Sequence, residues 1–131
     1  MPRLLQHTAG RALYWAPRVL SIAFILFLSL FALDVFQEGR RFWPTLAALA
    51  VHLIPSFVLV LVLIAAWRWE WIGAVVFAGA GGLYIHHTLE LKLSAAVKWS
   101  WCLGIAAPAL VIAALFLCNW IQRCRRRSVG V

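Results

Sequence analysis

The sequence is poor in acidic residues and in charge overall. Four Asp and Glu stand against twelve Lys and Arg, and charged residues make up only 12% of the 131 positions. A soluble domain carries about 25% charged residues, so this composition argues against an ordinary soluble protein. The net charge is +8. Because most basic residues flank apolar runs and no nucleic-acid-binding pattern accompanies them, we expect anionic lipid as the partner and no nucleic acid.

The patterns that bind metals or carry redox chemistry are missing as well. The three cysteines, Cys102, Cys118 and Cys124, form no CxxC pair, so a dithiol redox centre is unsupported. The four histidines show no HxxH or HxxxH spacing. A membrane hydrolase would need a nucleophile with a base in reach, and no such pair is evident. We therefore predict no enzyme, no cofactor and no catalytic or metal-binding residue.

Long apolar runs fill most of the chain, which is 65% hydrophobic. The run Phe42–Ala66 has one ionisable side chain, His52. At about 1.5 Å rise per residue a helix of this length is about 37 Å long, enough to cross a hydrocarbon core of about 30 Å. The run ends in Trp67–Trp71, and a second apolar run follows at once. This pattern predicts two membrane helices joined by a tight turn.

The whole chain, 1–131, is predicted to form one all-α domain, a four-helix transmembrane bundle. Pro17 suits the first position of a helix, and Pro108 should bend the last span. Residues 1–16 fit either a short interfacial helix or a frayed basic leader. We expect the longest loop at 87–98. The predicted spans are about 17–36, 42–66, 69–85 and 99–121, followed by a basic cytoplasmic tail at 122–131.

The orientation follows from the tryptophans and the basic residues. All eight tryptophans fall near ends of predicted spans, as in an interfacial belt. Eight of the twelve Lys and Arg lie in the N-terminus, the middle turn and the tail, and four lie in the other two loops. The excess places both termini in the cytoplasm. We expect a multi-pass protein of a bacterial cytoplasmic (inner) membrane, with tail contacts to anionic headgroups by Arg123, Arg125, Arg126 and Arg127.

Four segments together resemble a family of small, uncharacterised four-helix bacterial integral membrane proteins. They are YWAPR (14–18), LFALDVF (30–36), HLIPS (52–56) and WRWEW (67–71). The likeness covers about the first two-thirds of the chain and weakens in the last span. The resemblance implies a four-span architecture, but it carries no established activity and no functional residue.

A few polar residues near or within the spans are candidates for a site. Asp34 is the only acid inside an apolar run, and we interpret it as a headgroup-level acid paired with a loop arginine; the alternative is a functional carboxylate. His52 lies near mid-membrane. Imidazole and thiol groups suit metal or haem, but the expected depths of these side chains differ. The other three candidates are His86, His87 and Cys102.

Two stripes of small or polar residues predict faces buried between helices. In span 3, Ala74, Ala78 and Gly82 recur at four-residue spacing, which allows another helix to approach closely. In span 2, His52 lies on a stripe with Thr45, Ala48 and Ser56, and Pro55 deprives one carbonyl of its helix partner. We predict that the ring of His52 bonds a backbone carbonyl or a hydroxyl of another span, as a structural clasp; the alternative is a proton relay.

The most economical functional interpretation is a non-enzymatic integral membrane protein with an accessory or structural role. A membrane-protein partner or a second copy of the chain is the expected assembly. The competing class is a small transporter or channel subunit, although span 1 lacks the membrane-central acid that small proton-coupled exporters use. The third is a metal- or haem-binding redox subunit.

Overall fold

The computed structural model describes residues 2–30 and 42–129, with side chains over 11–30 and 42–128, and almost all of this chain is helical. No strand occurs in these residues. The elements are α1 (Pro2–Leu30), α2 (Phe42–Arg68), α3 (Glu70–Glu90), α4 (Ala95–Trp101), the π-helical turn η2 (Cys102–Ala106) and α5 (Ala107–Val129).

Four of the described helical segments are long and apolar enough to cross a membrane, which confirms the all-α class and the four long helices. These segments run further than the predicted spans at most of their ends. They are Arg11–Leu30, Phe42–Arg68, Glu70–Glu90 and Ala95–Ser128.

The first helix differs from its prediction. α1 is continuous from Pro2 to Leu30, and Pro17 lies inside it instead of at its first position. The described residues before Pro17 are therefore part of the same helix, and form neither a separate short helix nor a frayed leader. A proline inside a helix removes one hydrogen bond, so the carbonyl four residues earlier, that of Leu13, needs another partner.

The region expected to be the longest loop is mostly helical. α3 continues to Glu90 and α4 begins at Ala95, which leaves only 91–94 as an extended link. Lys98 Nζ donates to the carbonyl of Leu89 at 2.7 Å, and the backbone N–H of Lys98 donates to Ser94 at 3.1 Å. Lys98 and Ser94, two of the polar residues that suggested a loop, thus make hydrogen bonds in a tight reversal between α3 and α4.

The expected distortion at Pro108 is a local π-helical turn. The turn η2 ends at Ala106, two residues before the proline, and the N–H of Ala107 donates to the carbonyl of Cys102, five residues back. A π-turn of this kind absorbs one extra residue without ending the helix. α4, η2 and α5 therefore form one uninterrupted helical segment, the fourth that is long and apolar enough to cross a membrane.

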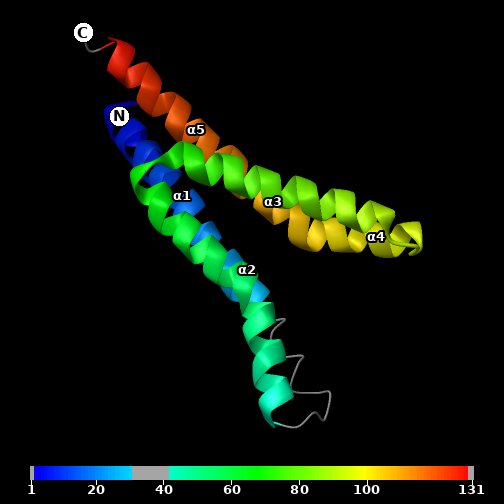
Figure 1. Cartoon of the computed structure of the whole chain (residues 1–131). Helices are drawn as coiled ribbons and strands as arrows, with labels where there is room; N and C mark the ends of the chain where they lie inside the picture. Colours follow the sequence, from blue (N-terminus) through cyan, green and yellow to red (C-terminus); the bar gives the residue numbers. More distant parts are fainter. Residues whose placement is uncertain (1, 31–41, 130–131) are drawn as a thin grey trace.

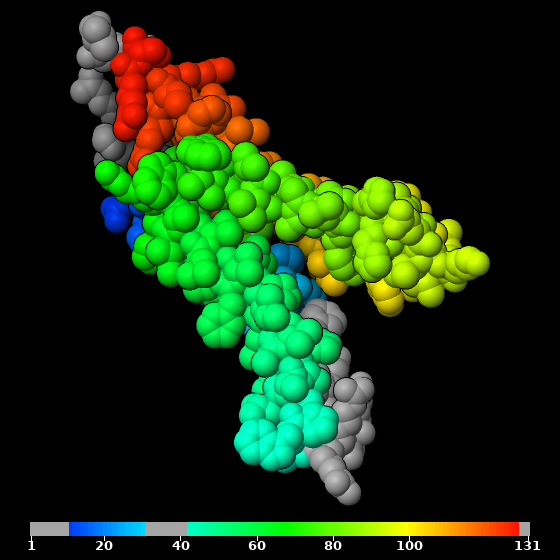
Figure 2. Space-filling model, in the orientation of Figure 1, coloured from blue at the N-terminus to red at the C-terminus, as the bar shows by residue number. Residues whose placement is uncertain are grey.

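The four long helices form two hairpins, α1 with α2 and α3 with α5, that diverge from a shared end (Figure 1). Both termini and the α2–α3 turn lie at that end. The α3–α4 link lies at the far tip of its hairpin. Neighbouring helices touch in the order α1, α2, α3, α5, and α5 returns to α1. Space-filling atoms leave the two arms well apart beyond the shared end (Figure 2).

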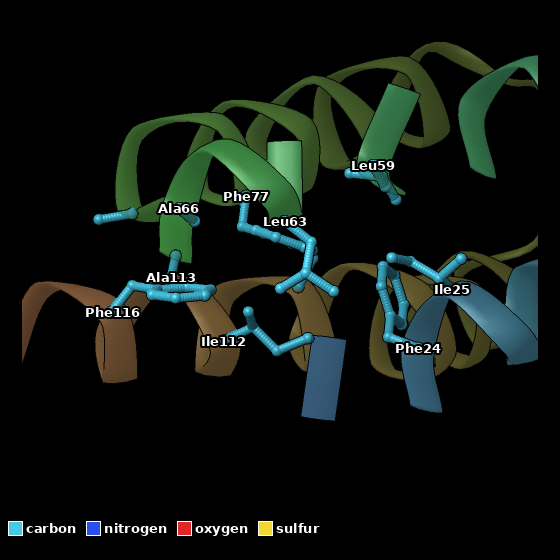
Figure 3. Packing of buried hydrophobic residues seen from close by; sticks show 11 residues of the cluster. Phe24, Ile25, Leu59, Leu63, Ala66, Phe77, Ile112, Ala113 and Phe116 are labelled. Carbon is cyan, nitrogen blue, oxygen red and sulfur yellow. The ribbon is translucent and has the colours of Figure 1, made fainter. Parts of the chain in front are cut away.

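The apolar core fills the region where the hairpins meet, and every long helix contributes to it (Figure 3). Phe77 is fully buried, with its ring centroid 6.4 Å from that of Phe24 and 6.2 Å from that of Phe116. Phe77 therefore contacts both α1 and α5. The core consists of Phe24, Ile25, Leu59, Leu63, Ala66, Ala74, Phe77, Ala109, Ile112, Ala113 and Phe116.

The small residues of α3 pack on a different face from the predicted one. Ala74 is buried, but Ala78 and Gly82 are exposed, and a Cβ at Gly82 would meet nothing within 4 Å. The close approaches are at Gly73, where a Cβ would lie 2.8 Å from Phe116 Cδ2, and at Gly81, where it would lie 3.1 Å from Leu110. The predicted stripe was wrong because a strict four-residue spacing drifts around a helix of 3.6 residues per turn.

Candidate functional site

A buried ion pair joins the two hairpins at their shared end. Arg18 of α1 and Glu70 of α3 are only 1% and 3% exposed, and Arg18 Nη2 lies 3.2 Å from Glu70 Oε1. The two residues are 52 positions apart in the sequence. An ionised pair in such a site must offset a desolvation cost of several kcal/mol per ion, so it is placed by the surrounding fold.

Arg18 has further partners on its own helix. Its Nη1 donates to the carbonyl of Tyr14, and its guanidinium carbon lies 3.6 Å from the centroid of the Tyr14 ring, a cation–π arrangement. Arg18 Nε and Glu70 Oε2 are both buried without a hydrogen-bond partner among the described residues. These two atoms are the donor and acceptor that a side-on, two-bond pairing of Arg18 with Glu70 would join.

Glu70 is positioned by the reversal between α2 and α3. A single residue, Trp69 (φ −128°, ψ 89°), separates the helices. Its N–H donates to Ala65 at 2.8 Å, and its carbonyl accepts from Ile72 at 3.0 Å. Glu70 is thus the first residue of α3, where the helix dipole stabilises a carboxylate. A second cation, Arg123 of α5, lies 3.9 Å from Glu70 Oε1.

A side chain of α5 compensates for the proline inside α1. Pro17 has no N–H, so the carbonyl of Leu13 loses its bond within the helix. Asn119 Nδ2 donates to that carbonyl at 2.7 Å, across 106 residues of sequence. Ser21 Oγ donates to the carbonyl of Pro17 itself at 2.6 Å. The Ser21 bond stays within α1, and the bond from Asn119 ties α1 to α5 five residues before Arg18.

An open pocket of about 260 Å³ adjoins the ion pair, and Glu70 is part of its lining. It lies between the α2–α3 turn and the last turns of α5, which are adjacent in Figure 2. Three guanidinium groups and three indoles share its lining with one carboxylate. The lining residues are Arg68, Trp69, Glu70, Trp71, Trp120, Arg123 and Arg127.

The chemistry of this end is that of charge and hydrogen bonding. Three arginines line the pocket while the charge of Glu70 is already balanced by Arg18. Among the described residues, no group of three or more His, Cys, Asp and Glu side chains comes together as a metal site would require. The arrangement suits the binding of an anion, since guanidinium groups present several donors in a planar fork.

His52, the residue expected to clasp another span, does not reach one. Its side chain is exposed, and Nδ1 lies 2.9 Å from the carbonyl of Ala48 in the same helix. Ser56, one turn further along the predicted stripe, is buried but has no hydrogen-bond partner among the described residues. The prediction that His52 clasps another helix near Pro55 was therefore wrong. The structure has such a bond between helices near a different proline, where Asn119 bonds the carbonyl that Pro17 leaves free.

The other sequence candidates stay apart from this site. His86 and His87 are exposed near the end of α3, and His86 Nδ1 lies 3.8 Å from Glu90 Oε1. Cys102 is a free, half-buried cysteine in η2. Asp34 lies outside the described residues. All four tail arginines are exposed; Arg123 and Arg127 line the pocket, and Arg125 and Arg126 do not.

Sequence reasoning missed the three residues that matter most here. Arg18 and Glu70 lie at the ends of apolar runs, within the segments YWAPR and WRWEW, and neither was a candidate from the sequence. Asn119 is the only asparagine in the chain. A lone amide in an apolar span is a signal for a partner in another helix, because an unpaired amide in hydrocarbon is costly.

Comparison with known families matches residues 6–129 to a domain of unknown function, DUF7670. The chain belongs to the DUF7670 family. The match spans all four long helices of this DUF7670 member, and so includes Arg18, Glu70, Asn119 and the pocket. Neither a comparison with curated proteins nor one with solved structures gives a match.

Proposed function

We propose that this DUF7670 chain is a non-enzymatic, four-span protein of a bacterial cytoplasmic membrane with an accessory or structural role. Its termini and α2–α3 turn lie on the cytoplasmic side. The single observation that carries the proposal is the gathering of three basic segments at one end of four apolar helices, around the Arg18–Glu70 pair. Basic segments flanking spans are retained in the cytoplasm.

The distribution of tryptophan supports the membrane setting. All eight tryptophans are exposed. Five of them lie at the shared end, and the other three lie at or near the far ends of the hairpins, Trp43 on α2 and Trp99 and Trp101 on α4. Indole rings prefer the two membrane–water interfaces, so such a distribution fits helices that cross from one interface to the other.

Thiol labelling in the native host tests both integration and orientation. Cys124, exposed on α5 at the shared end, should react with a membrane-impermeant maleimide only after permeabilisation. In a Cys102→Ser, Cys118→Ser, Cys124→Ser background, Ser94→Cys in the α3–α4 link should react in intact cells. The protein should remain in membranes after alkaline extraction. Labelling of Cys124 in intact cells, or release by alkali, would refute the proposal.

An accessory role predicts a stoichiometric partner, or a second copy, that co-purifies in mild detergent. Purification of the full chain from its host, followed by mass measurement of the complex, tests this directly. We keep a small transporter as the second candidate because Glu70 is a buried carboxylate between helices, a common feature of transport pathways. Ion flux into proteoliposomes that is abolished by Glu70→Gln, without a partner in the complex, would favour transport.

A further inference from the structure

We propose that the pocket between the α2–α3 turn and the end of α5 is a binding site for the phosphate group of an anionic lipid. The proposal rests on the membrane setting proposed above and adds a ligand and a defined place for it. A uniform basic tail would attract lipid through all its arginines. A pocket would bind lipid only through the arginines that line it, so variants of lining and non-lining arginines distinguish the two cases.

The charge in the pocket is available to a ligand. Glu70 is the only acid in the lining, and it is already paired with Arg18 at 3.2 Å. Arg123 lies 3.9 Å from Glu70, beyond hydrogen-bonding distance. In the described part of the chain, no carboxylate lies within salt-bridge distance of Arg68 or Arg127. Three guanidinium groups therefore face the pocket with donors free for phosphate oxygens.

The pocket divides the tail arginines by helical geometry. Arg123 and Arg127 are four residues apart and share one face of α5, the face that lines the pocket. Arg125 and Arg126 are exposed elsewhere on the same helix. Each pair carries two positive charges at the same end of the protein. The two pairs differ in whether they line the pocket, so they form a matched comparison.

The surroundings point to a lipid as the source of the phosphate. Trp69, Trp71 and Trp120 line the pocket, and indoles concentrate at headgroup depth. Each indole N–H is also a donor that a phosphate oxygen accepts. The volume of about 260 Å³ is slightly below that of pockets for drug-sized ligands, so it suits a headgroup while the acyl chains remain in the bilayer.

Native mass spectrometry of the delipidated full chain tests the site. The protein in neutral detergent is titrated with phosphatidylglycerol, and with phosphatidylcholine as the reference. We expect Arg123→Gln/Arg127→Gln to weaken phosphatidylglycerol binding at least about tenfold, from the loss of charge-assisted hydrogen bonds. Arg125→Gln/Arg126→Gln should stay within about twofold of wild type, since neither residue lines the pocket.

A second variant and a competition arm complete the test. Because Arg123 lies near Glu70, Arg68→Gln/Arg127→Gln repeats the experiment without touching that neighbour. Excess inorganic phosphate distinguishes the sources. If phosphatidylglycerol stays bound in excess phosphate, the ligand is the lipid headgroup. If phosphate displaces the lipid, and the variants weaken phosphate binding as they weaken lipid binding, the pocket is a phosphate site that soluble phosphate also fills.

Equal weakening by the two tail pairs would overturn the proposal, since it would mean that diffuse charge and not the pocket attracts lipid. No weakening by either pocket variant, or equally tight binding of phosphatidylcholine, would overturn it as well. Alkaline extraction of the same variants separates this outcome from failure of the proposed function. All variants should stay in the membrane whether or not the pocket binds lipid.

Discussion

At the scale of single residues, two charged side chains and one amide hold the shared end together. Arg18 and Glu70 are buried, and each is the main counter-charge of the other. Removing one partner of a buried pair leaves an uncompensated charge, whereas removing both leaves none. This asymmetry gives the pair a testable signature.

Glu70→Gln should lower the free energy of unfolding by about 3–5 kcal/mol, because Arg18 keeps its charge in a buried site. The loss should be much smaller in Arg18→Leu/Glu70→Leu, where no buried charge remains. Denaturant titration in mixed micelles measures both. Glu90→Gln is the matched control, since Glu90 is 66% exposed and should change stability little. A Glu70→Gln protein as stable as this control would contradict the assignment.

The bond from Asn119 to Leu13 is explained by the missing N–H of Pro17, and a double-mutant cycle can show it. Asn119→Ala should cost about 1 kcal/mol because the carbonyl of Leu13 loses its partner. In a Pro17→Ala background the cost should shrink, since a restored N–H at position 17 bonds the same carbonyl. Unfolding in micelles gives the four free energies. Equal costs in both backgrounds would show that the two residues act independently.

The sequence shows the residue types of this site but not their pairing. Arg18 and Glu70 flank apolar runs, where a charge is normally solvated, so the sequence did not single out either residue. Their contact depends on how α1 and α3 meet, and local pattern carries no information on that. The prediction for His52 failed for a related reason: its ring nitrogen Nδ1 lies within hydrogen-bonding distance of the carbonyl of Ala48 in its own helix, so a polar residue in a span does not by itself require another helix.

At the scale of elements, apolar run length predicted the four long helices well, and boundary signals did less well. The length of an apolar run can be counted in the sequence, and runs of about 20 residues are typical of helices long enough to cross a membrane. Pro17 and the polar residues at 87–98 suggested boundaries, yet helix continues through the first and most of the second. Partners elsewhere in the fold, such as Asn119 for Leu13, offset the local penalty.

Close packing of α3 against α2 and α5 depends on Gly73 and Gly81. Gly73→Ala should destabilise the protein by about 1–3 kcal/mol, because its Cβ would lie 2.8 Å from Phe116 Cδ2 and 3.0 Å from Ala66 Cβ. Gly82→Ala, on the same helix but with open space around it, should cost nothing measurable. Thermal unfolding in detergent compares the two. The opposite order would show that the face predicted from spacing is the packed one.

At the scale of the whole molecule, the two hairpins are joined at one end and apart at the other (Figure 1). Family resemblance and span count predicted four helices, but not this divergence. Contacts between α1 and α5 and between α2 and α3 connect the hairpins. The core residues that make those contacts look, in the sequence, like any other residues of an apolar span, so their arrangement could not be read from composition.

The contacts at the shared end should set the angle between the two hairpins, which form the two arms of the molecule. Spin labels at Leu46→Cys and Ser94→Cys, in a background with the three native cysteines replaced by serine, report the separation of the arm tips. We expect a single narrow distance distribution by pulsed electron paramagnetic resonance, and a broader one with Glu70→Gln, because the ion pair ties α1 to α3. Glu90→Gln should leave the width unchanged. A width insensitive to Glu70 would assign control of the angle to the apolar core alone.

The contacts at the shared end join residues far apart in the sequence, and this has a consequence for biosynthesis. During synthesis the counter-charge of Arg18 follows it by 52 residues, and the amide that bonds the carbonyl of Leu13 follows that residue by 106. Until α3 and α5 have been made, Arg18 lacks its counter-charge and the carbonyl of Leu13 lacks its partner. A chain that includes Glu70 but stops before Asn119 has the counter-charge of Arg18 and still lacks the amide that bonds the carbonyl of Leu13. The packing of the first helix is therefore complete only when the last helix has been made.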